Sequence, residues 1–110
     1  MMFGKKKSGR EGEIDVAEYD FLDGSREFAR LWCEADGPFS CLIEPRNLGP
    51  DPFTFGMAMV DTIRHAARAY AQAVGITEDH ALAVIYEGFD AERVKNTTGL
   101  DTVQNLEKPN

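Results

Sequence analysis

Four polar side chains in one stretch of the sequence could do chemistry: Asp61, Arg64, His65 and Arg68. In a helix, the carboxylate of Asp61 would be a surface neighbour of both Arg64 and His65, because residues three and four apart lie on one face. An imidazole oriented by a carboxylate beside two guanidinium groups could bind an anion or move a proton. The alternative is a solvated helix face whose ion pairs stabilise it by only about 0.2–0.5 kcal/mol each. We therefore treat the four residues as a candidate ligand-binding site and assign no catalytic residue.

A helix over residues 52–74 would position these side chains. Asp51 is a good N-cap, Pro52 suits the first helical position, and Gly75 suits a left-handed C-cap. Apolar residues at helical spacing form two adjoining sectors that sweep roughly 200°, well beyond the ~100° stripe of an ordinary surface helix. Such a helix must be covered on two sides, and in a chain of 110 residues a second copy is a natural cover. The two sectors are Phe53, Met57, Val60, Ile63, Ala67, Ala71 and Val74, and Phe55, Met59, Ala66, Tyr70 and Ala73.

Residues 27–35 and 39–44 predict a β-hairpin, because apolar residues alternate along both segments and Asp36-Gly37-Pro38 is typical of a turn. A three-residue loop over 36–38 would put the apolar residues of both strands on one core-facing side. The predicted pairs are Ala35 with Phe39, Cys33 with Cys41, and Leu31 with Ile43. In this register the two cysteines are small hydrophobic residues of a sheet core. A disulfide or a metal pair is the alternative, although no second pair of ligands accompanies the two cysteines.

A second helix is predicted over residues 78–95, with Thr77 as its N-cap and acidic residues in its first turn. Residues 14–21 could add a third strand to the hairpin. The predicted class is therefore α+β, with a small antiparallel sheet packed against two helices in a single domain over 14–95. Residues 1–13, which are basic, and residues 96–110 are predicted to be flexible tails.

The formal net charge is −7. Residues 1–12 carry +3, so the remaining 98 residues carry −10, and an acidic body argues against a general nucleic-acid binder. Weak electrostatic contact through the tail cations Lys5, Lys6, Lys7 and Arg10 is the exception. The sequence shows no signal peptide and no run of 18 apolar residues, which predicts a cytoplasmic protein without a membrane span and with reduced cysteines. It contains no phosphate-loop, dinucleotide, zinc-protease or serine-hydrolase motif, so we predict no cofactor and no metal.

Several short motifs together resemble a family of short bacterial proteins that is known only as a domain of unknown function. They are Trp32, Asp36-Gly37, DPFTFG at 51–56, D-x-x-R-H-x-x-R-A-Y at 61–70 and Phe89-Asp90-Ala91-Glu92, within about residues 26–95. Phe55 stands where the family pattern leads us to expect Trp. The resemblance implies a fold and a bacterial origin but no activity, and it places Asp61, Arg64 and His65 inside a family motif.

These observations favour a binding or assembly module that forms a homodimer, alone or with another protein partner, over an enzyme. The predicted interface comprises Phe28, Trp32, Leu42, Phe55, Met59 and Tyr70. The alternative function is a small-molecule or anion site, with catalysis left open, around Asp61, Arg64, His65 and Arg68.

Overall fold

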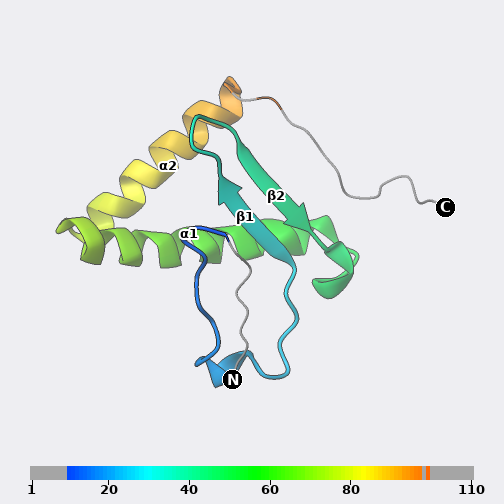
Figure 1. Ribbon diagram of the computed structural model, residues 1–110. Helices are drawn as coiled ribbons and strands as arrows, with labels where there is room; N and C mark the ends of the chain where they lie inside the picture. Colours follow the sequence, from blue (N-terminus) through cyan, green and yellow to red (C-terminus); the bar gives the residue numbers. More distant parts are fainter. Residues whose placement is uncertain (1–9, 98, 100–110) are drawn as a thin grey trace.

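The computed structural model describes residues 10–97 and 99 of the chain. Its elements are the 3-10 helix η1 (Asp20–Leu22), strands β1 (Ala29–Cys33) and β2 (Phe39–Ile43), the 3-10 helix η2 (Pro45–Asn47), and helices α1 (Pro52–Val74) and α2 (Glu78–Val94). The strands form a two-stranded antiparallel sheet. In Figure 1 the two helices diverge from the turn that joins them, and the hairpin lies across α1 in this view. The predicted α+β class is confirmed, whereas predictions for residues 1–9, 98 and 100–110 lie outside the described residues.

The ends of both helices follow local capping signals. The Asp51 carboxylate accepts a hydrogen bond from the Phe53 N–H at 3.0 Å at the start of α1. At its end, Gly75 is left-handed with φ of 75°, a conformation that glycine adopts without strain. The Thr77 hydroxyl accepts from the His80 N–H at 3.0 Å and starts α2. The predicted range of α1 is confirmed, and α2 ends one residue earlier than predicted, at Val94.

The two helices pack through small residues where they cross. Ala67 of α1 and Ala81 of α2 are 1% and 2% exposed, and they are the only fully buried hydrophobic residues among those described. Arg68 of α1 reaches across to Glu78 of α2, with Nε and Oε2 3.5 Å apart. Two alanines bring the helix backbones close but bury little apolar area, so this crossing is a small core for a domain of this length.

The register of the hairpin differs from the prediction by two residues. Ala29 pairs with Ile43, Leu31 with Cys41, and Cys33 with Phe39. The loop still has three residues, but they are 35–37, because the Glu34 N–H donates to the Pro38 carbonyl at 3.1 Å. Pro38 cannot return this bond because it has no N–H, and Gly37 donates to the Glu34 carbonyl instead, at 3.2 Å. A shift of two residues preserves the predicted faces while changing every pair.

The prediction that Cys33 and Cys41 lie in a sheet core is wrong for this chain. Both are free and exposed. No Cα atom of either strand lies within 8 Å of a Cα atom of either helix, so neither helix closely covers the sheet. The opposite face is better covered: the Phe28 ring meets Phe55 of α1 edge-on at 6.1 Å. The Arg10 guanidinium lies 5.9 Å from the centre of the half-buried Trp32 ring.

Residues 14–21 do not form the predicted third strand. The Asp15 carboxylate accepts from the Ala17 N–H at 3.0 Å, and the Tyr19 N–H donates to the Val16 carbonyl at 3.2 Å. These local bonds compete with extended structure, and the chain turns into η1. In Figure 1 this segment descends below α1 to η1, and the residues that follow η1 lead back up to β1.

Candidate functional site

Three of the four predicted site residues lie together at the crossing of the helices. Arg64, His65 and Arg68 line a depression of about 250 Å³. Ala67 lies between them, and α2 contributes Glu78, Asp79 and Leu82 to the opposite wall. Asp61 does not line this depression. The α2 residues of the wall come from its first turn, which the Thr77 cap holds in place.

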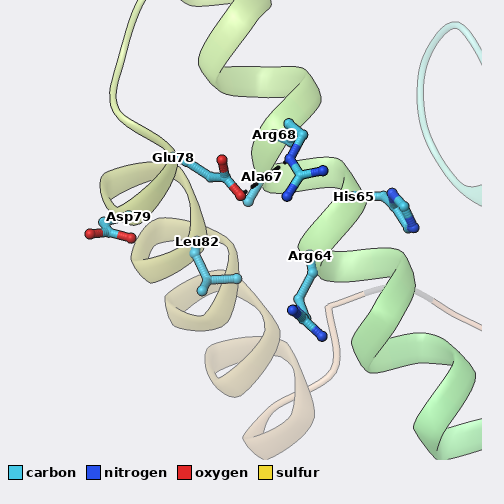
Figure 2. A pocket seen from close by; sticks show the side chains of 7 residues that line it. All are labelled: Arg64, His65, Ala67, Arg68, Glu78, Asp79 and Leu82. Carbon is cyan, nitrogen blue, oxygen red and sulfur yellow. Dashed lines mark ion pairs between the residues drawn. The ribbon is translucent and has the colours of Figure 1, made fainter.

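The ion pairs in this region differ from the arrangement that the sequence suggests. Asp61 pairs with Arg64, with Oδ1 and NH1 3.5 Å apart. Figure 2 shows the His65 ring pointing away from Glu78 and Asp79, on the far side of α1. The described contacts of Asp61 therefore join it to Arg64 and not to His65, and the geometry contains no carboxylate-oriented imidazole.

The depression has charges of both signs in its walls. Arg64 and Arg68 line it together with Glu78 and Asp79, and of these four only Arg68 and Glu78 form an ion pair across it. The arginine side chains are 69% and 65% exposed. Ion pairs this exposed contribute little, about 0–1 kcal/mol each, so either arginine can exchange its present partner for another anion at small cost. Two guanidinium groups are the donors that a carboxylate or phosphate ligand would need.

An apolar surface continues from these arginines along α1. Phe53, Met57 and Val60 are 72%, 56% and 45% exposed. At 100° per residue they share one side of the helix with Arg64 and Arg68. We call Phe53, Met57, Val60, Arg64 and Arg68 the α1 stripe. Because α2 crosses α1 at Ala67 and then diverges, it leaves the N-terminal part of this surface bare.

The six predicted interface residues divide into two groups. Phe28, Trp32, Phe55 and Met59 are half-buried within the chain, whereas Leu42 and Tyr70 are exposed. The first group therefore has less surface to offer a partner than the bare residues of the α1 stripe. Their role in an interface stays a prediction.

Sequence reasoning missed a pair of short ion pairs at the open end of the hairpin. Arg46 donates from Nε to Glu44 at 2.8 Å, and Arg30 donates to Glu27. The hydrogen bonds from the Arg46 side chain and backbone lower the pKa of Glu44 to about 2. The hydrogen bond from Arg30 likewise lowers the pKa of Glu27. Glu27, Arg30 and Glu44 border a second depression of about 240 Å³, but their charges satisfy one another.

The described residues contain no group of three or more His, Cys, Asp or Glu side chains that could hold a metal ion. Within the same part of the chain, no helix is both long and apolar enough to cross a membrane.

Comparison with known proteins shows a family and a relative of solved structure. A family model described as a domain of unknown function (DUF5076) matches residues 22–97. A structure from the photosynthetic bacterium Rhodopseudomonas palustrus CGA009, described as a putative pyruvate dehydrogenase, is 34% identical in sequence. The alignment covers 94% of this chain and 98% of that chain, with a TM-score of 0.59. No curated protein matches the chain.

Proposed function

This chain belongs to the DUF5076 family, and from its structure we propose that it is an association module whose working form is a homodimer. The observation that carries the proposal is that the buried core is too small for the amount of secondary structure in the chain. Two well-capped helices and a hairpin are present, yet only Ala67 and Ala81 are fully buried among the described hydrophobic residues. Most helical stability in proteins comes from packing of an apolar face, so further cover is needed.

The uncovered apolar side chains lie on several elements of the chain. Large apolar residues that are about half exposed or more occur on α1, at Phe53 and Met57, and on the hairpin, at Leu31 and Phe39. So many large apolar side chains left bare are typical of an interaction surface in soluble proteins. A second copy is the simplest partner, because two-fold dimers are the commonest oligomers and need no other gene product.

A charge placed on the α1 stripe tests this proposal. We expect Met57→Glu to convert the dimer to a monomer, because it would put an unpaired carboxylate into an apolar interface. Ala69→Glu is the matched control, since Ala69 is exposed on the opposite side of α1. Sedimentation velocity measures the mass of each variant. If both variants formed dimers of equal affinity, the α1 stripe would not be part of the dimer interface.

The second candidate is a site for a small carboxylate at the depression between α1 and α2. Arg64 and Arg68 supply the cations that such a ligand needs. The related chain is described as a putative pyruvate dehydrogenase, which makes pyruvate the first ligand to try. We rank this function second because the two arginines already pair with Asp61 and Glu78.

Titration with pyruvate followed by NMR tests the second candidate. We expect the backbone amide signals around Arg68 to move with rising pyruvate concentration, and we expect Arg68→Gln to abolish the movement. Sodium chloride at equal ionic strength is the control for screening. If chloride produces the same movement, pyruvate has no specific site there.

We also infer that the protein is bacterial and lies in the cytoplasm. The related structure of bacterial origin supports the bacterial source. The two free, exposed cysteines support the cytoplasmic location, because thiols persist in reducing compartments.

A further inference from the structure

Residues 14–25 form a second surface that combines apolar and charged groups, and we call this segment the arm. Four backbone hydrogen bonds shape it, and each joins an N–H to the carbonyl three residues earlier. The first runs from Tyr19 to Val16 and the last from Ser25 to Leu22. The arm nevertheless exposes its large apolar side chains to solvent, and its two aromatic rings touch only each other in the ring contacts described. These side chains are Ile14, Val16, Tyr19, Phe21 and Leu22, of which Ile14 and Phe21 are 80% and 73% exposed.

The chain covers its own arm only in part: Leu22 is 38% exposed, whereas Ile14 and Phe21 stay largely bare. No Cα atom of η1 lies within 8 Å of a Cα atom of either helix or either strand. Fixing the backbone of one residue costs roughly 1–2 kcal/mol, and exposed apolar side chains return none of it. A turn-rich segment in this position therefore needs a surface from outside the chain.

The arm and the α1 stripe are complementary in both polarity and charge. The arm carries Asp15, Glu18, Asp20 and Asp23 and no cation. None of these four carboxylates is in an ion pair with the cations that the structure describes. The α1 stripe offers exposed apolar side chains followed by Arg64 and Arg68, whose present ion pairs are 3.5 Å long and largely exposed. The arm therefore carries apolar and anionic groups that are complementary in kind to the apolar and cationic groups of the α1 stripe.

We propose that the arm of one copy lies on the α1 stripe of a second copy, with its aromatic residues against Phe53, Met57 and Val60 and its carboxylates near Arg64 and Arg68. This exchange of arms rests on the homodimer proposed above and specifies how it is built. In this arrangement a second copy of the chain supplies further carboxylates to the two arginines of the candidate site, and no small-molecule ligand is needed.

A disulfide trap distinguishes the exchanged arm from other arrangements. All variants carry Cys33→Ser and Cys41→Ser, which replace exposed side chains. One chain carries Ala17→Cys on the arm, and a co-expressed, differently tagged chain carries Val60→Cys on the stripe. The control partner carries Ala69→Cys on the opposite side of α1. Mild oxidation followed by non-reducing electrophoresis measures the linked heterodimer, and circular dichroism checks that every variant folds.

We expect the Val60→Cys partner to give about tenfold more linked heterodimer than the Ala69→Cys control, because the complex raises the local thiol concentration to about millimolar. Equal linkage to both partners, in a protein that light scattering shows to be dimeric, would overturn the exchanged arm and leave the homodimer standing. A monomer by light scattering would overturn both. An internal disulfide in a single chain carrying both Ala17→Cys and Val60→Cys, without linked dimer, would show that the arm folds onto its own helix and would also overturn the exchange.

Discussion

The two ends of α1 share one apolar sector but differ in the size of its side chains and in their surroundings. At the C-terminal end, α2 crosses at Ala67 and buries it almost completely. At the N-terminal end, Phe53 and Met57 stay largely exposed, although both belong to the same apolar sector of the helix. The difference shows that helical periodicity identifies a face to be covered without identifying what covers it.

The covered end is also the end where small residues meet. Alanine at both sides of the crossing lets the backbones approach, and a hydrogen-bonded turn at Gly75 and Thr77 fixes the direction of α2. At the bare end, the large side chains keep any neighbour at a greater distance. The chain therefore provides one tight contact for itself and, by our proposal, one broad contact for a partner.

The largest expected effect comes from breaking the covered end. Ala67→Leu should destabilise the protein by about 1–3 kcal/mol, because Ala67 is only 1% exposed where the helices pack and a longer side chain must displace its neighbours. Thermal unfolding followed by circular dichroism at fixed protein concentration measures the change. Ala69→Leu, at an exposed position on the same helix, should stay within about 0.5 kcal/mol of the parent chain. Equal melting temperatures for the two variants would mean that the crossing is not tightly packed.

The next prediction concerns the two N-caps, Asp51 at the bare end of α1 and Thr77 at the start of α2, near the crossing. Thr77→Ala and Asp51→Ala should each cost about 1 kcal/mol, because each leaves an N–H of the first turn without its acceptor. Thr77→Ser is the control, since it retains the hydroxyl and should keep nearly all the stability. Urea unfolding gives these differences. A loss after Thr77→Ser as large as after Thr77→Ala would point to packing of the methyl group as the cause.

A glycine at the bare end provides a change of opposite sign. Gly56 lies inside α1, and a Cβ atom added there would meet no heavy atom within 4 Å. Gly56→Ala should therefore stabilise the chain by about 0.5–1 kcal/mol through the lower entropy of the unfolded state. We expect the dimer mass to stay unchanged. A higher melting temperature together with dissociation would place Gly56 in close contact with the partner.

The smallest expected effect is a pH dependence at the hairpin. Arg46 lowers the pKa of Glu44 from 4.5 to about 2 in the folded chain, so the pair stabilises the fold above pH 4.5. This stabilisation is lost as the pH falls from 4.5 towards about 2, because the unfolded chain then binds the proton first. Glu44→Gln should flatten the decline of melting temperature in this window only slightly, since the side chain of Arg46 is 88% exposed. An unchanged slope would show that the pair makes no difference to stability.

The helices could be predicted from the sequence because their signals are local. Asp51-Pro52, Gly75 and Thr77 act within one turn of the residues that they cap, and the structure shows each in its predicted role. The two faces of the hairpin were predictable for a similar reason. Side chains alternate between the faces of a strand whichever residues the strand pairs with. The family resemblance over residues 26–95 is confirmed by the match over 22–97.

The rest depended on interactions between distant parts of the chain. The hairpin register turned on whether Ala35 pairs or enters the loop, and the hydrogen bond from the Glu34 N–H to the Pro38 carbonyl places Ala35 in the loop. The burial of Cys33 and Cys41 required a helix over their face, which no periodicity could supply. Within the site, Arg64, His65 and Arg68 line the depression and Asp61 does not, and the roles of the four residues stay a prediction. Glu78 and Asp79 were missed because their place beside α1 depends on the turn at Gly75.

Light scattering of the full chain over a hundredfold range of concentration tests most directly whether this domain completes its core with a second copy. We expect a mass of two chains over most of the range, with dissociation at the lowest concentrations. A mass of one chain at every concentration, with cooperative unfolding, would contradict the homodimer, because the chain would then be stable with its apolar surface uncovered by a partner.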